Sequence, residues 1–190
     1  MVLKKQIKNI KTKPLTFLLA LTFLFLFSGF IFGDNFNDGV DALGKGDYKT
    51  AHRIFLKIAK KGDAKAQSNL GTMYSKGQGV PQDYKEAIKW YRLAAEQGDA
   101  LAQSNLGAVY LKGQGVPQDY KEAVRLFRLA GEQGQAIAQS NLGAVYLKGQ
   151  GVPQDYKEAV RLFRLAGEQG QAIAQSNLGA VYLKGQGVPQ

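Results

Sequence analysis

A 36-residue unit repeated in tandem constrains this sequence more than any other feature. The string AQSNLG occurs four times, each time 36 positions after the last. Residues 102–137 and 138–173 are identical throughout, and residues 66–101 match them at 26 of 36 positions. Self-similarity at a period of about 20–50 residues is the signature of arrays of supersecondary units. Such a unit cannot bury a core alone, so we expect neighbouring units to stack.

The repeat divides the chain into an N-terminal segment and an array of units. Upstream of Ala66, the sequence GDYKTAHRIFLKIAKKGDAKAQ aligns without gaps, at the same offset, on the sequence that starts at Gln82. The connector KGQGVPQ is missing there, so we expect a shortened first unit whose first helix spans 36–45. The predicted segments are a signal peptide or anchor, a shortened repeat, three full repeats and an incomplete one: 1–33, 34–65, 66–101, 102–137, 138–173 and 174–190.

Each full unit contains two predicted helices separated by a connector. In the first helix, Ala102, Leu106, Val109 and Tyr110 form an apolar stripe at helical spacing. Two glycines and a proline in the following segment, 112–117, oppose helical continuation. The pattern therefore predicts that the first helix ends where this connector begins.

The second helix carries signals at both of its ends. Asp119 is a good N-cap residue, Glu122 completes a capping box three positions later, and Gly134 supplies a left-handed stop. Leu126 and Leu129 lie outside the predicted core face, so the helix is apolar over a wide arc. Such a helix suits a position with neighbours on both sides, as in a stacked array. The predicted core face consists of Tyr120, Ala123, Val124, Phe127, Ala130 and Gly131.

Spacing and residue types together resemble a known repeat family. The unit reads A-x-A-Q-x-x-L-G-x-x-Y, then G-x-G-V-x-x-D, then A-x-x-W/L-Y/F-x-x-A-A/G-x-x-G. This combination is similar to the Sel-one-like repeat (SLR) family, relatives of tetratricopeptide repeats, over residues 46–190 and more weakly over 36–45. The resemblance implies an all-α fold: an α-solenoid in which antiparallel helix pairs form a right-handed superhelix, used as an adaptor for proteins or peptides.

The N-terminal segment has the layout of an export signal. Five lysines fall within residues 4–13, and residues 15–33 then run without a charge. Lysines stay in the cytoplasm while the apolar stretch enters the membrane, which places the repeats outside. The stretch approaches the roughly 20 residues of a membrane span. We expect cleavage after Gly29 or Gly33 and a periplasmic or secreted protein; the alternative is an uncleaved helix that anchors the repeats outside the membrane.

Composition excludes several classes of function. Half of the net charge of +10 belongs to the N-terminal lysines, and the other charges alternate in sign, which argues against a nucleic-acid partner. The chain has no cysteine, which excludes disulfides, thiolate metal sites and a cysteine nucleophile. We therefore predict no cofactor and no metal.

No catalytic constellation emerges from the sequence. His52 is the only histidine, and it stands where later units have Ile88 or Val124, so we interpret it as an edge residue. The recurring Gly-x-Gly follows a helix instead of a strand, unlike a phosphate-binding loop. Helix capping accounts for Asp83 and Glu86. We therefore predict that the protein is not an enzyme.

Two further sets of residues receive structural interpretations. Trp90 and Tyr91 are expected in the core, where the next unit has Leu126 and Phe127. One asparagine per unit forms a ladder, which we expect to satisfy neighbouring backbone groups: Asn69, Asn105, Asn141 and Asn177.

A binding surface is expected on the face of the first helices opposite the predicted core. In the copied units this face is small, apolar and mildly basic. It recurs at a regular pitch, which favours an extended or repetitive partner because each added unit raises avidity. The predicted residues are Ser68, Thr72, Ser75, Lys76, Ser104, Leu111, Lys112, Ser140, Leu147 and Lys148.

The predicted function is a non-enzymatic scaffold outside the cytoplasm that binds a protein or peptide through the concave face of its helix pairs. The alternative is a module that binds carbohydrate or an envelope polymer, and a hydrolase is a weaker third. A membrane is expected as a partner only through residues 15–33, if these are retained. Val181, Tyr182 and Leu183 keep the apolar character of the internal copies, which predicts a self-associating edge or a place within a longer array.

Overall fold

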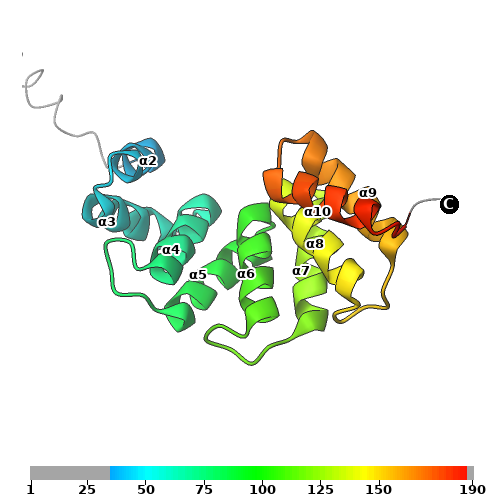
Figure 1. The fold of residues 1–190 in the computed structure, drawn as a ribbon. Coiled ribbons are helices and arrows are strands. Elements are labelled where there is room, and N and C mark those ends of the chain that lie inside the picture. Colours follow the sequence, from blue (N-terminus) through cyan, green and yellow to red (C-terminus); the bar gives the residue numbers. More distant parts are fainter. Residues whose placement is uncertain (1–34, 188–190) are drawn as a thin grey trace, which may run out of the picture. The chain divides into compact units, whose positions relative to one another are not determined.

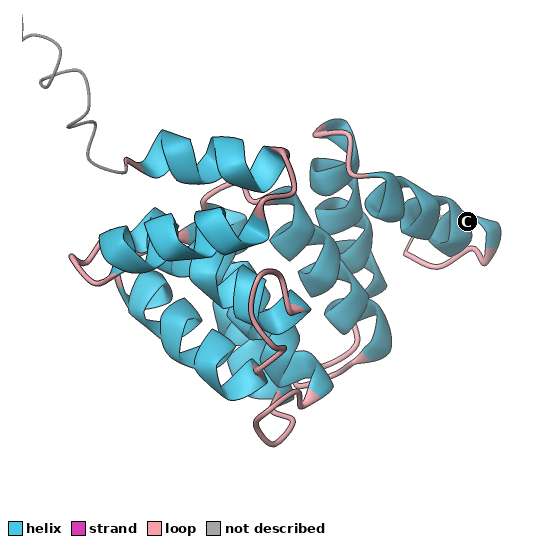
Figure 2. Ribbon diagram, turned by 90° about the vertical axis from the view of Figure 1, so that its left-hand side faces the viewer, coloured by secondary structure: helices cyan, strands magenta, loops and turns pink. Residues whose placement is uncertain are grey.

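The computed structural model describes residues 35–187, and this part of the chain forms helices joined by loops (Figures 1 and 2). The predicted all-α fold is confirmed. The predicted signal or anchor at 1–33 lies outside the described residues, and within 35–187 no helix is long and apolar enough to cross a membrane. The helices are α2 (Phe36–Gly44), α3 (Tyr48–Ala59), α4 (Ala64–Lys76), α5 (Tyr84–Glu96), α6 (Ala100–Lys112), α7 (Tyr120–Glu132), α8 (Ala136–Lys148), α9 (Tyr156–Glu168) and α10 (Ala172–Leu183).

The helices alternate between two structural roles. We call α2, α4, α6, α8 and α10 the first helices of their repeats, and α3, α5, α7 and α9 the second helices. Each helix packs against the next one along the chain, and from α4 onward successive first helices also contact one another, as α4 does with α6 and α6 with α8 (Figure 1). This regular stacking is the arrangement of an α-solenoid.

Local sequence signals set the helix ends. Asp119 lies just before α7, and its carboxylate accepts a hydrogen bond from the Glu122 backbone N–H at 3.0 Å. Gly113 follows α6 with a φ of 67°, the left-handed conformation that glycine adopts most readily. Gly134 likewise follows α7 with a positive φ. These predicted caps and stops are confirmed, but the capping box is incomplete because the Glu122 carboxylate pairs with Arg125.

The core lies between stacked helices and runs through the array. The rings of Phe55, Phe127 and Phe163 are fully buried, each on a second helix. Trp90 and Tyr91 are buried as predicted. The predicted first-helix stripe is also confirmed, because Ala102, Leu106 and Val109 are buried and Tyr110 is half-buried.

Leu126 explains why the second helix is apolar over a wide arc. It is 2% exposed and belongs to a cluster that joins Tyr91 of the preceding repeat to Leu106 and Val109 of its own first helix, so it faces toward the preceding repeat. Phe127, its neighbour in sequence, packs instead with Ala138 and Leu142 of the following first helix. The prediction that this helix has neighbours on both sides is therefore confirmed.

Glutamine side chains form hydrogen bonds both within a repeat and between neighbouring repeats. The amide of Gln133 donates to the Gln103 side chain at 2.8 Å. Gln103 in turn donates to the backbone carbonyl of Ala95 in the preceding second helix at 3.2 Å. Equivalent side-chain bonds join Gln97 to Gln67 and Gln169 to Gln139. Buried amides satisfied in this way fix the register between neighbouring repeats.

Candidate functional site

The structure places much of the predicted first-helix face inside the array. Ser68 and Ser104 are each 1% exposed and Ser140 is 3% exposed. The prediction that these serines lie on a solvent face is wrong. A helical pattern shows one core face per helix, whereas a first helix in a stacked array also packs against the next first helix.

Thr72 and Ser75 also lie at contacts between helices. The Tyr91 hydroxyl donates to Thr72 Oγ1 at 3.2 Å, and the Asn105 amide of the next repeat approaches the same oxygen at 3.4 Å. Ser75 Oγ lies 3.2 Å from the Tyr91 hydroxyl. Burial raises the pKa of Tyr91, and its hydrogen bonds with Ser75 and Thr72 oppose that rise. These polar groups therefore bind one another at contacts between helices.

The remaining residues of the predicted face divide into two kinds. Leu111 and Leu147 are half-buried and pack against hydrophobic clusters that join the second helix of their own repeat to the next repeat. The lysines at the ends of the first helices are exposed: Lys76, Lys112 and Lys148. Among the predicted residues of this face, this row of lysines is the part exposed to solvent.

The predicted asparagine ladder is not uniform. Asn69 donates to the backbone carbonyl of Lys65 in its own helix at 2.8 Å. Asn105 instead contacts the Thr72 side chain. The following copy has Ala108 in place of that threonine, so Asn141 lacks the same acceptor. The expectation of a backbone-satisfying ladder is met at Asn69 and not at Asn105.

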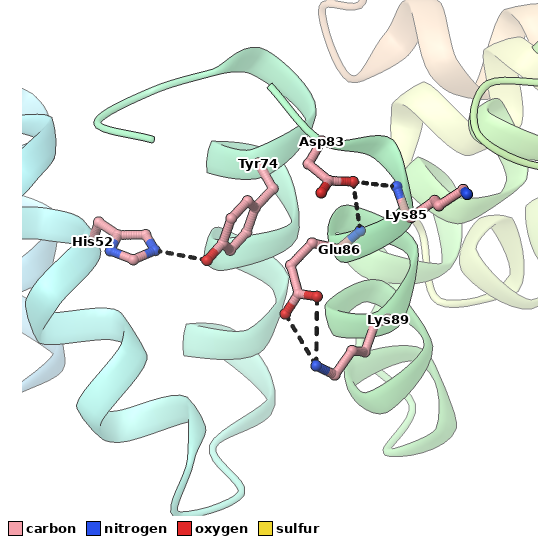
Figure 3. Close-up of polar contacts among 6 residues, drawn as sticks. All are labelled: His52, Tyr74, Asp83, Lys85, Glu86 and Lys89. Atoms are coloured by element: carbon pink, nitrogen blue, oxygen red, sulfur yellow. Dashed lines mark hydrogen bonds and ion pairs between the residues drawn. The ribbon is translucent and has the colours of Figure 1, made fainter. Parts of the chain in front are cut away.

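His52 lies beside the first complete repeat and contacts a tyrosine (Figure 3). Its Nε2 is 3.3 Å from the Tyr74 hydroxyl, and the two rings meet edge to face with centroids 5.4 Å apart. Burial lowers the pKa of His52. Within residues 35–187 no group of His, Asp and Glu side chains gathers as a metal site would require. His52 is therefore a packing residue with one polar contact.

Two equivalent grooves open between successive second helices. Groove I lies between α5 and α7, with α6 as its floor, and has a volume of about 470 Å³. Groove II lies between α7 and α9, with α8 as its floor, and has a volume of about 220 Å³. Groove I is lined by Arg92, Ala95, Glu96, Gly98, Gln103, Leu106, Tyr110, Glu122, Arg125, Leu126 and Leu129. Groove II is lined by Arg128, Gly131, Glu132, Gln139, Leu142, Tyr146, Glu158, Arg161, Leu162 and Leu165.

The two grooves have the same chemistry because they come from the same repeated sequence. Each residue that lines groove II has a counterpart 36 positions earlier in groove I, and the residue type differs only where Gly131 replaces Ala95. Buried leucines form the floor, and charged side chains of the second helices form the rims. Sequence reasoning did not find these grooves, although Leu126 and Leu129 outside the predicted core face were a signal.

A tyrosine hydroxyl and an arginine meet at one end of each groove. Arg92 donates to the Tyr110 hydroxyl at 2.7 Å in groove I, and Arg128 donates to the Tyr146 hydroxyl at 2.7 Å in groove II. In groove II the Arg128 guanidinium also lies over the Tyr146 ring, 5.9 Å from its centroid. These contacts orient long side chains that would otherwise move freely.

The opposite wall of groove I carries an ion pair. Arg125 donates from Nε and from an NH2 group to the two carboxylate oxygens of Glu122, at 2.8 and 2.7 Å. The hydrogen bond to Glu122 raises the pKa of Arg125, as its counterpart with Glu158 raises the pKa of Arg161. The charges of this pair therefore compensate each other.

The space between α3 and α5 has different residues at the corresponding positions. Trp90 stands where groove I has Leu126, and Leu56 stands where groove I has Arg92. The indole is 7% exposed and packs with Leu70 and Met73 of α4. Because an indole is larger than a leucine side chain, Trp90 fills more of the space between α3 and α5 than Leu126 fills between α5 and α7.

Comparison with known proteins identifies the family to which these helix pairs belong. The Sel1 repeat matches five consecutive segments, 33–63, 64–99, 100–135, 136–171 and 172–190. The chain belongs to the Sel1 repeat family. The resemblance seen in the sequence is thereby confirmed. The family's repeats begin two residues earlier than the units 66–101, 102–137 and 138–173, at the first residue of each first helix.

Solved structures include close relatives of this Sel1 repeat chain. A Sel1 repeat protein from Oxalobacter formigenes is 40% identical, with a TM-score of 0.70 over 74% of this chain and 56% of that one. The SLR-fold protein c5321, a protective antigen of uropathogenic Escherichia coli strains, is 43% identical, with a TM-score of 0.68 over 72% of this chain and 29% of that one. This chain thus matches little more than half of the first relative and less than a third of the second.

A more distant structure shares the fold alone. Cysteine-rich protein B of Helicobacter pylori is 23% identical, with a TM-score of 0.53 over 67% of this chain and 96% of that one. A comparison with curated proteins gave no match. Sel1 repeat proteins are helical scaffolds that typically mediate protein interactions. The family is generally non-catalytic.

Proposed function

We propose that this Sel1 repeat protein is a non-enzymatic scaffold that binds a protein or peptide partner in grooves I and II. The observation that carries the proposal is the equivalence of the two grooves, which present the same leucine, tyrosine, glutamine and charged side chains 36 positions apart. Binding sites combine an apolar floor with a few polar groups that set orientation. Leu106 on the floor and Leu126 on the adjoining wall supply such an apolar surface in groove I, and Tyr110, Arg92 and Gln103 supply the polar groups.

The open shape of these grooves favours an extended peptide as the partner. Each groove lies between two helices and is open to solvent along its rim, where Leu129 and Leu165 are 37% and 36% exposed. Exposed leucines in register with the grooves add apolar contact area for a partner that crosses the second helices. The exposed row Lys76, Lys112 and Lys148 is a second candidate surface, because it is the part of the predicted first-helix face that solvent reaches.

We further propose that the partner is met outside the cytoplasm. The lysine-rich start and the uncharged stretch at 15–33 support export, followed either by cleavage or by retention as an anchor. Fractionation of cells that carry a C-terminally tagged chain tests this. A tag in the periplasm, medium or membrane fraction supports export, whereas a tag in the cytoplasm overturns it.

Affinity capture with the tagged full chain tests the binding function. Captured material is divided in two, and one half is treated with protease and the other with glycosidases. Loss of the bound material on proteolysis supports a protein or peptide partner. Loss on glycosidase treatment alone supports the alternative, a carbohydrate or envelope-polymer partner, and overturns the proposal.

A further inference from the structure

Each groove holds one arginine that forms no ion pair within the described residues. Among residues 35–187, no carboxylate forms an ion pair with Arg92 or Arg128, whereas Arg125 and Arg161 are paired with glutamates on their own helices. Arg92 and Arg128 each donate one hydrogen bond to a tyrosine hydroxyl. A guanidinium has five N–H donors, so the other N–H groups can bind a ligand. A planar guanidinium held in this way is suited to bind a carboxylate through two parallel hydrogen bonds.

The groove also limits how much negative charge it accepts. Glu96 lines groove I one helical turn after Arg92, and Glu132 lies in the same relation to Arg128 in groove II. Neither glutamate forms an ion pair within the described residues. A densely charged polyanion would place further negative charges near these glutamates, and such like-charge contacts cost binding energy. The charge pattern therefore favours one isolated carboxylate in each groove.

We propose that each groove binds one acidic side chain of an extended peptide, with an apolar neighbour of that residue on the leucine floor. The carboxylate lies at Arg92 and Tyr110 in groove I and at Arg128 and Tyr146 in groove II. The apolar side chain contacts Leu106 and its counterpart Leu142, which are buried at the base of each groove. This assignment rests on the proposed function and adds to it the chemistry of the partner.

The shared wall of the two grooves sets the spacing of the acidic residues. Helix α7 contributes Arg125 and Leu126 to groove I, and Arg128 and Glu132 to groove II. Packed helices lie about 8–10 Å apart, so second helices on either side of a first helix are at most about 20 Å apart. An extended peptide advances about 3.3 Å per residue, which gives at most about six residues from one groove to the next. One peptide that spans both grooves gains from effective concentration.

Fluorescence anisotropy with the full chain tests the assignment. The probe is a labelled peptide with two Leu-Glu pairs about five residues apart in a Gly/Ser background, a spacing set by the helix pitch. Its matched control replaces both glutamates with glutamine. We expect the glutamate peptide to bind about ten-fold more tightly, and the difference to shrink at high salt. The combined variant Arg92→Gln, Arg128→Gln is expected to abolish that preference.

A matched variant controls for the loss of net charge. Lys85→Gln with Lys121→Gln removes the same charge from the same helices at positions that do not line grooves I or II, and it is expected to keep the preference. Equal binding of the two peptides would overturn the carboxylate assignment. So would tighter binding of a galacturonic acid oligomer that is lost in the arginine variant.

The proposed function is tested separately within the same series. If the leucine-containing peptides bind and the variant Leu126→Trp, Leu162→Trp abolishes this binding, grooves I and II are the site whatever the preference for glutamate. If both peptides still bind to this variant, the proposal that grooves I and II are the binding site is wrong. Absence of any binding would contradict both the partner chemistry and the grooves.

Discussion

Gly107 on α6 lies directly against the aromatic ring of Phe127 on α7. A Cβ atom added at Gly107 would stand 2.8 Å from Cε1 of that ring. The same relation joins Gly143 to Phe163, at 2.9 Å, in the next repeat. The glycine of the Leu-Gly pair therefore allows the two helices of a repeat to approach closely, and a buried aromatic ring fills the space that it leaves: Tyr91 against Gly71, Phe127 against Gly107 and Phe163 against Gly143.

Gly107→Ala is expected to lower the free energy of unfolding by about 1–3 kcal/mol, because the added methyl group forces the Phe127 ring or the helix to move. Gly179→Ala is the matched control. It lies at the same position of α10 with no atom within 4 Å of the added Cβ, so the better helix propensity of alanine should leave stability unchanged or slightly higher. Urea denaturation followed by circular dichroism measures both. Equal losses would contradict the proposed packing.

The second glycine of each connector is expected to be more sensitive than the glycine after the second helix. Gly115 has a φ of +74°, and an added Cβ would lie 2.6 Å from Cβ of Tyr84, on the preceding second helix. Gly134 has a φ of +84° but no atom within 4 Å. Gly134→Ala should cost about 1–2 kcal/mol for the left-handed backbone alone. Gly115→Ala should cost at least about 1 kcal/mol more because of overpacking. A similar midpoint for both variants in urea would show that the connector does not pack on the preceding repeat.

His52 predicts a specific dependence of stability on pH. Burial lowers its pKa below the usual 6.5, so the unfolded chain takes up the proton more readily than the folded chain. The stabilising effect of the neutral ring is complete above pH 6.5 and is lost as the pH falls below that value. His52→Gln should flatten the change in urea midpoint between about pH 7 and pH 5, above the range where most carboxylates titrate. An unchanged slope in the variant would exclude His52 as its source.

The exposed lysine row gives a direct comparison between the two candidate surfaces. Lys112→Glu combined with Lys148→Glu reverses two exposed charges on the first helices, at positions that do not line groove I or groove II. If the partner binds in the grooves, affinity capture by this variant should stay within about two-fold of the native chain, the small effect expected of distant surface charges. Loss of capture would indicate that the partner binds the lysine row on the first helices and not the grooves.

The repeat length, the helix ends and much of the core could be predicted from the sequence because they depend on local signals. Asp119, Gly113 and Gly134 act within one turn of their own helices, and Leu106 and Phe127 mark helix faces through regular spacing. These features follow from contacts between residues that are close in sequence or related by the repeat.

The site could not be predicted in the same way because it depends on three helices from two repeats. The sequence shows that Ser104 lies opposite the core of its own repeat, but not that stacking of the helices buries it. It also does not show that Arg92 on α5 and Arg125 on α7 face one groove above Tyr110. Val181 illustrates the same limit: it was expected at an exposed edge and is 1% exposed, whereas Leu183 is 91% exposed.

Closing the grooves with tryptophan tests the central claim most directly. Trp90 shows that this position accommodates an indole, so Leu126→Trp combined with Leu162→Trp should fill grooves I and II while circular dichroism shows the helices retained. Leu93→Trp, at an exposed leucine that lines neither groove, is the matched control. We expect the double variant to lose at least about 90% of affinity capture, equivalent to about 1.4 kcal/mol or more of binding free energy, and the control to retain it. Undiminished capture by a folded double variant would contradict the grooves as the binding site.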